Sequence, residues 1–175
     1  MKDTRKQIPH WVWLTSQFVW QIQQSLEQDP NQSIGNLFTS FLKSQSITDP
    51  SLFSLKNQGT VLMLMYGLVV VPKEIWGAEV LDKSFPFTTK TEFKIVQPEH
   101  GLSNSQLIKS LRNAIAHANF AIYSGLDQCV FWNMNKNGQR NFETVVSWQG
   151  IGRFLTEVGT HYLNNVINQD DNKGW

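Results

Sequence analysis

Apolar side chains in the first half of the chain recur at three- and four-residue intervals, which is the spacing of one face of an α-helix. The first such stretch predicts an amphipathic helix over about residues 11–27. A break at DPNQSIG precedes a short second helix in IGNLFTSFLKS. A third helix is expected to begin at Pro50, with Asp49 as its cap, and to continue until Pro72 interrupts it. Its second half is apolar on most sides, which predicts a central place in a helical bundle.

The second half of the chain mixes helical and strand-like patterns. SFPFTTKTEFKIVQPEHGLSNS has no sustained helical period, and we expect a long connection with one short strand at EFKIV. Ser103 and Gln106 form a capping-box pattern, which predicts a helix over about 104–124 that stops at Gly125. Runs rich in Val, Phe and Trp on both sides of KNGQ predict a β-hairpin over about 128–146. Ser147 is expected to cap a last helix over about 148–168.

These elements predict a mainly α fold, a bundle of about five helices with a β-hairpin before the last helix. The 175 residues match the usual size of a single domain, so we expect one domain over 1–175. Seven Trp and eleven Phe are many large rings for a chain of this length. They indicate a second apolar surface besides the core, and therefore self-association.

Charge and cysteine content narrow the setting. A formal net charge of +1 creates no long-range attraction for nucleic acid, so any contact with RNA must come from a local basic cluster. Cys129 is the single cysteine, and it is expected to pack as a small hydrophobe. Because the sequence has no pair of cysteines, a structural zinc site is not expected. The start of the chain lacks the pattern of a secretory signal, and GTVLMLMYGLVVVP is shorter than the roughly 20 residues of a membrane span. We therefore expect a cytoplasmic protein with no membrane contact, no metal and no cofactor.

The stretch SLRNAIAHANF gives the predicted 104–124 helix two different faces. At about 100° per residue, its aliphatic side chains fall within about 60° of Leu111 and form a stripe for the core. The stripe consists of Leu107, Ile108, Leu111, Ile115, Ala118 and Ile122. The opposite face carries Lys109, Asn113, Ala116, His117 and Phe120, with Arg112 at its border.

The polar side chains of that face allow two interpretations. Lys109, Asn113 and His117 follow one another at i, i+4 and i+8, so they form one ridge, which could be a solvated face where Asn113 merely hydrogen-bonds His117. The other interpretation is a phosphate site. The long side chain of Arg112 can swing its guanidinium toward the imidazole, so that one anion meets both groups. Lys109 is then a candidate substrate-binding residue.

Ala116 and Phe120 favour the phosphate site. Ala116 is small enough for another helix to come close, and Phe120 would expose a large ring unless something covered it. A two-fold partner copy would cover the ring and bring two arginines and two histidines into one cleft. Guanidinium groups bind phosphate oxygens bidentately, and a histidine with its ordinary pKa of about 6.5 exchanges protons near neutral pH. Together they suit attack of a ribose 2′-hydroxyl on its own phosphate without a metal ion.

The hexapeptide from Arg112 to His117, RNAIAH, resembles the R-polar-x3-H signature of the HEPN superfamily. The following Ala118, Asn119 and Phe120, the helix–hairpin–helix ending and the LVVVPKEIW segment are similar to bacterial and plasmid-encoded HEPN proteins. The resemblance implies an all-α, usually dimeric bundle that cleaves RNA without metal, often in toxin–antitoxin, phage-defence or RNA-processing systems. It implies that His117 is the acid–base residue, that Arg112 holds the phosphate, and that Asn113 orients the histidine or the substrate.

Other functions stay open at this point. Some HEPN proteins are non-catalytic, so a module that binds RNA or a protein partner without turnover is the main alternative. A third hypothesis is a partner of a separately encoded nucleotidyltransferase. The toxin hypothesis implies an antitoxin as a further partner.

Overall fold

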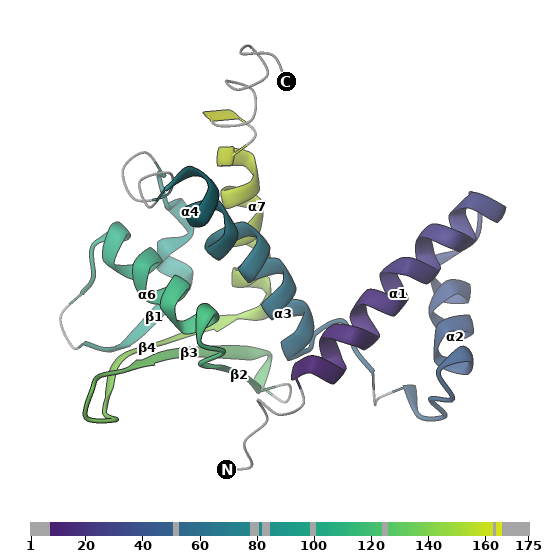
Figure 1. Cartoon of the computed structure of the whole chain (residues 1–175), viewed down its shortest axis with the longest axis horizontal. Coiled ribbons are helices and arrows are strands. Elements are labelled where there is room, and N and C mark those ends of the chain that lie inside the picture. The colour runs from purple at the N-terminus through teal and green to yellow at the C-terminus, as the bar shows by residue number, and fades with distance from the viewer. Residues whose placement is uncertain are drawn as a thin grey trace. The chain divides into compact units, whose positions relative to one another are not determined.

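A computed structural model of the chain describes residues 8–50, 53–77, 81, 85–98, 101–123, 126–162 and 164–165. The fold is mainly α with one antiparallel sheet (Figure 1). The chain packs as two compact units, Met1–Val61 and Leu62–Trp175, which we describe separately. The single domain over 1–175 stays a prediction, because packing into two units does not test whether either folds alone.

The first unit is built on a helical pair, α1 (Ile8–Gln28) and α2 (Ile34–Ser44), which confirms the two predicted amphipathic helices. Ser33 caps α2 by accepting a hydrogen bond from the Asn36 backbone N–H. The two helices enclose a small core of large rings and leucines. Its buried members are Leu14, Phe18, Phe41, Leu42 and Phe53.

The third helix begins later than the sequence indicates. Residues 53–57 are not helical, and α3 (Gln58–Met65) is capped by Asn57, whose side-chain oxygen accepts the Thr60 backbone N–H at 3.0 Å. Phe53, buried between α1 and α2, explains the difference, because a chain that enters this core cannot also continue the helical axis of α3. The predicted start at Pro50 is therefore wrong.

Pro72 does not end this helix either. The chain continues from α3 through a π-helical stretch, η3 (Tyr66–Val70), into α4 (Val71–Trp76), where Pro72 lies in the first turn. A proline has no N–H to donate to the carbonyl four residues earlier, which here belongs to Leu68. The hydroxyl of Tyr162 donates to that carbonyl at 2.8 Å. A side chain from the end of α7 thus contributes a hydrogen bond at the carbonyl that Pro72 cannot serve.

The predicted β-hairpin is confirmed in part, because its two strands pair but form the middle of a four-stranded sheet. β3 (Gln128–Met134) and β4 (Arg140–Ser147) pair antiparallel around a turn with Gly138 at φ 74°. β1 (Lys94–Gln97), the strand expected at EFKIV, and β2 (Phe120–Tyr123) lie outside them in the order β1-β4-β3-β2. Figure 1 shows α6 (Asn104–Ala116) and α7 (Trp148–Tyr162) on one face of this sheet.

α6 begins where its capping box predicts and ends eight residues before the predicted end. Ser103 and Gln106 exchange the two expected hydrogen bonds at the start. At the other end, Ala118 takes a left-handed conformation with φ 51°; its N–H bonds to the Ile115 carbonyl, and the Asn119 N–H bonds to Ala114 at 2.7 Å. This pattern is a Schellman turn, which ends a helix. The predicted helix to 124 is therefore wrong, and its stop, Gly125, lies outside the described residues.

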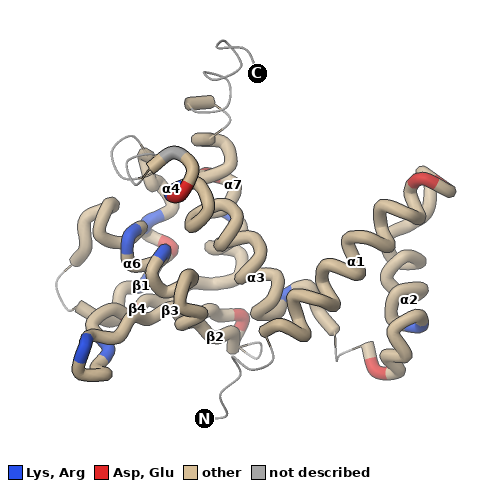
Figure 2. The backbone as a smooth tube through the Cα atoms, viewed as in Figure 1, with Lys and Arg blue, Asp and Glu red and all other residues tan. Residues whose placement is uncertain are grey.

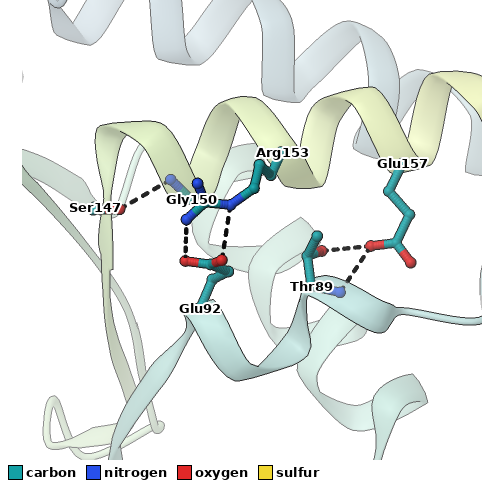
Figure 3. Close-up of polar contacts among 6 residues, drawn as sticks. All are labelled: Thr89, Glu92, Ser147, Gly150, Arg153 and Glu157. Carbon is teal, nitrogen blue, oxygen red and sulfur yellow. Dashed lines mark hydrogen bonds and ion pairs between the residues drawn. The ribbon is translucent and has the colours of Figure 1, made fainter.

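The last helix, α7, starts at the predicted cap, where the Ser147 hydroxyl accepts the Gly150 N–H at 2.9 Å. Its predicted end near 168 falls partly outside the described residues. Two carboxylates join α7 to η4 (Thr88–Glu92), as Figure 3 shows. Glu92 binds Arg153 through two oxygens, at 2.8 and 2.7 Å. Glu157 accepts the N–H and hydroxyl groups of residues 88 and 89, and these hydrogen bonds hold its pKa below the usual value although partial burial opposes them.

Two further expectations concern Cys129 and membrane-spanning helices. Cys129 is fully buried on β3, which confirms its packing role, and burial raises the pKa of its thiol to about 12. Among the helices of the described residues, none combines the length and the apolar character that a membrane span needs.

The turn after α6 gives a stability prediction with opposite signs at neighbouring alanines. Ala118→Gly should raise the free energy of unfolding by about 0.5–1 kcal/mol, because glycine adopts φ 51° without the steric cost of a Cβ. Ala116→Gly, in the last helical position, should lower it by about 0.5–1 kcal/mol. Urea unfolding followed by circular dichroism measures both. Destabilisation by Ala118→Gly would contradict a helix that ends at Ala116.

Candidate functional site

The two faces predicted for α6 are present over the length of the helix that forms. Lys109, Asn113, Ala116 and His117 are exposed. The opposite side is buried in the unit, and consists of Leu107, Ile108, Leu111, Ala114 and Ile115. His117 itself is the C-cap residue of α6, and its backbone N–H bonds to the Asn113 carbonyl at 3.1 Å. The histidine is therefore fixed at the helix end rather than within a continuing helix.

An open groove of about 520 Å³ runs between α6 and the β3–β4 hairpin. It contains three of the residues predicted from the sequence, Lys109, Asn113 and His117. Among the described residues, its lining consists of Lys109, Ser110, Asn113, His117, Asn119, Asn133, Met134, Asn141 and Phe142. Because four of these nine residues are asparagines, we call it the amide groove.

Backbone and side-chain hydrogen bonds hold the two walls of the amide groove together. The Asn133 side chain on β3 donates to the Ser110 carbonyl on α6 at 2.9 Å. The Trp132 N–H donates to the Asn119 carbonyl at 3.0 Å, next to the turn that ends α6. These bonds tie the hairpin to the exposed side of the helix, so the groove is a fixed feature of the second unit.

Most polar side chains in the amide groove have no protein partner. Those of Lys109, Asn113, His117, Asn119 and Asn141 make no hydrogen bond or ion pair to any residue that the structure describes. Polar groups in folded proteins are usually paired, with each other or with water. One cation, one imidazole and three amides that converge unpaired on a groove make a site where a polar ligand can bind. Besides Lys109, α6 contains one further lysine or arginine, Arg112, and Figure 2 shows basic residues near the β3–β4 turn.

Arg112 does not join this group. It is not in the lining of the amide groove, and its residue surface is only 7% exposed. Its positive charge acts on Tyr162 of α7, where burial raises the pKa of the phenol and the guanidinium opposes that rise. Five residues along a helix separate two side chains by about 140°, which places Arg112 and His117 on different sides. Arg112 and His117 are therefore not brought together in the amide groove, and their joint contact with one phosphate stays a prediction.

The two residues predicted as dimer contacts, Ala116 and Phe120, differ in their exposure to solvent. Ala116 is exposed, as expected. Phe120 is fully buried and stacks against Phe131 with ring centroids 5.9 Å apart. The expectation of an exposed ring is wrong because α6 ends at Ala116, so Phe120 enters β2 and points into the core. An uncovered Phe120 therefore gives no reason for a partner copy.

The sequence prediction missed the asparagines that come from outside the helix. Asn119 follows the turn, and Asn133 and Asn141 lie on the two strands of the hairpin. Asn119 was part of the motif stretch, but a helix continued to 124 would have placed it elsewhere. The other two have no local signal, because they approach α6 only when the sheet packs against it.

A comparison with known families matches almost the whole chain. The family model described as HEPN pEK499 p136 matches residues 1–169. No curated protein and no solved structure matches the chain.

Because Arg112 is buried, we predict that it stabilises the fold. Lys109 is exposed, and we predict that it contributes little to stability. Arg112→Ala should lower the free energy of unfolding by about 2–4 kcal/mol, since it removes a buried group and leaves its surroundings unfilled. Lys109→Ala, at an exposed position of the same helix, should change it by less than about 0.5 kcal/mol. Urea unfolding compares the two. Equal stability of Arg112→Ala and wild type would place Arg112 outside the core.

Proposed function

The chain belongs to the HEPN pEK499 p136 family, and on that premise we propose that it binds single-stranded RNA in the amide groove and cleaves it without a metal ion. The observation that carries the proposal is the convergence of Lys109 and His117 with unpaired amides in one groove. A basic side chain and an imidazole supply the charge and the proton transfer that cleavage of a phosphodiester needs.

The length of the amide groove favours an extended ligand. Lys109 and His117 lie eight residues apart, which corresponds to about 12 Å along α6. A single phosphate cannot contact both ends at hydrogen-bond distance. A short RNA segment can, because its phosphates and bases follow one another along the strand. Open access to the groove also suits an unpaired strand, whose bases are free to turn toward protein side chains.

The proposed reaction is an internal transfer at one phosphate. The imidazole of His117 takes the proton of a ribose 2′-hydroxyl, and the 2′-oxygen forms a bond to the adjacent phosphorus. The bond from phosphorus to the 5′-oxygen of the next nucleotide breaks, and the histidine returns a proton to that oxygen. The products are a 2′,3′-cyclic phosphate, open to hydrolysis to the 3′-phosphate, and a 5′-hydroxyl. Lys109 attracts the phosphate backbone, and Asn113 contacts the substrate one turn from the histidine.

Arg112 has a different role in this proposal from the one that the family resemblance implies. Its burial beside Tyr162 supports a positioning role, in which it holds α6 against α7 and thereby fixes the side of the helix that carries His117. The exposed cation, Lys109, attracts another phosphate of the strand, one that lies further along the amide groove from His117.

A second candidate function is RNA binding without turnover. The burial of Arg112 favours it, because among the described residues Lys109 is the only lysine or arginine that lines the amide groove. Ribonuclease chemistry places more positive charge near the phosphate that reacts, since charge develops there in the transition state. In this case the groove would bind the same RNA and release it intact.

The remaining functional hypotheses concern partners. A homodimer is proposed with Ala116, at the end of α6, in its contact, since this small side chain permits close approach of a second helix. Two copies related by a two-fold axis would place two amide grooves along one RNA strand. Light scattering of the pure protein should then give twice the 20.1 kDa of one chain; a monomer mass would exclude the homodimer.

The same proposal includes a toxin or phage-defence role, with an antitoxin or a nucleotidyltransferase as partner. The identity of the neighbouring genes tests this role, because such a partner would be encoded beside the chain.

Loss of the imidazole is the direct test of cleavage. With labelled single-stranded RNA in EDTA, His117→Ala should cleave about 10²- to 10⁴-fold more slowly than wild type, the usual contribution of a general acid–base residue. His10→Ala removes another exposed histidine, on α1, and should cleave like wild type. Gel electrophoresis resolves the cyclic phosphate products.

The outcomes separate the two candidates. Equal cleavage by wild type and His117→Ala would exclude His117 as the acid–base residue. RNA binding by wild type in a gel-shift assay without cleavage would support the binding module instead. No binding at all would contradict both.

A further inference from the structure

The hairpin wall of the amide groove contains an irregularity in strand pairing. Asn133 of β3 faces Phe142 of β4, whereas the next residue of β3, Met134, faces Arg140. Between these pairs, β3 advances by one residue and β4 by two. Asn141 is therefore the extra residue of a β-bulge on β4.

The bulge lies in the wall of the amide groove, and Asn141 is one of the groove's lining residues. In a regular strand, neighbouring side chains point to opposite faces of the sheet. Here Asn141 and Phe142 are neighbours, and both line the amide groove. Bulges re-aim individual side chains and are frequent beside functional sites. Asn141 also lines a neighbouring groove with Val96, Gln97 and Arg140, so the extra residue of the bulge lies where two grooves meet.

The surroundings of Asn141 suit a flat ring with a polar edge. Its side chain is exposed and has no hydrogen bond to any described residue. Met134, on the opposite strand across the bulge, is 51% exposed and lines the same groove. A thioether side chain packs well against the face of an aromatic ring. An amide offers one donor and one acceptor side by side, which is the pattern that pairs with the edge of a nucleobase.

We propose that Asn141 and Met134 form a base-recognition subsite of the amide groove, with Met134 against the face of an unpaired base and Asn141 on its edge. The base assigned is adenine, because an asparagine amide pairs bidentately with its N6 amino group and N7. This inference rests on the proposed RNA function and adds selectivity to it. A neutral amide contributes little to a phosphate that Lys109 already attracts, so a base is the better match for Asn141.

The position of the subsite determines which kinetic quantity it affects. Asn133, the strand neighbour of Met134, bonds to Ser110, whereas His117 lies seven residues further along α6. That separation corresponds to about 10 Å along the helix. The recognised base is thus removed from the reacting phosphate. Asn141 is a specificity residue that acts through binding, and its loss should change affinity rather than the rate of the chemical step.

The test uses four fluorescein-labelled, 2′-O-methylated single-stranded RNAs that are identical apart from one central base, which is A, C, G or U. Without a 2′-hydroxyl they cannot be cleaved, so anisotropy reports binding alone. Wild type should bind the adenine RNA about 5- to 100-fold more tightly than the others, the range expected for one bidentate contact. Asn141→Ala should bring the four Kd values within about threefold of one another.

Two further variants sharpen the result. Asn141→Asp keeps an oxygen but loses the amide donor and should also lose the preference for adenine. Asn137→Ala changes an exposed asparagine at the turn of the same hairpin that does not line the groove, and it should keep the preference. Circular dichroism of all variants should match wild type, since both positions are exposed.

The outcomes distinguish this inference from the proposed function. If wild type binds all four RNAs with equal affinity, or if Asn141→Ala keeps the wild-type preference, the base subsite is excluded while RNA binding stands. A preference for another base that Asn141→Ala abolishes would overturn the assignment of adenine. If none of the four RNAs binds, the proposed function itself fails.

Discussion

The arrangement of the second unit depends on one backbone turn, the left-handed residue that ends α6. Ala118 at φ 51° lets two N–H groups of the turn bond back to the last helical carbonyls. A non-glycine residue in this conformation costs about 1–2 kcal/mol, so tertiary contacts must hold it. The burial of Phe120 against Phe131 is the contact that follows directly from the turn. The turn converts a helix into strand β2, adds that strand to the sheet and fixes His117 at the helix end.

α6, which ends at that turn, has a buried side and a side that lines the amide groove, the proposed RNA site. On the buried side, the charge of Arg112 acts on Tyr162, whose hydroxyl donates to the Leu68 carbonyl. On the groove side, the bonds between α6 and the hairpin are made by backbone groups and by Asn133, while Lys109, Asn113, His117, Asn119 and Asn141 have no side-chain partner among the described residues. The backbone of such a site is held in place by hydrogen bonds, and its polar side chains are available to a ligand. This combination suits a HEPN protein that recognises an extended RNA strand through several weak polar contacts.

Features controlled by local hydrogen bonds were predictable from the sequence. The capping box at Ser103, the cap at Ser147 and the turn before Gly138 depend on residues a few positions apart, and each forms as expected. The end of α6 was not predictable, because AIAHANF favours a continued helix and alanine disfavours φ 51°. Only the sheet, which forms from distant segments, stabilises that turn. The contribution of Asn141 was hidden for the same reason, since a one-residue change of register depends on both strands.

The central claim is that RNA binds along the amide groove rather than at Arg112. The most direct measurement is a titration of ¹⁵N-labelled protein with 2′-O-methylated single-stranded RNA, followed by the side-chain amide signals in NMR spectra. The account predicts that the signals of Asn113, Asn119 and Asn141 shift together with the same Kd, while the guanidinium signal of buried Arg112 stays in place. Shifts confined to residues outside the amide groove, with these three asparagine signals unmoved, would contradict it.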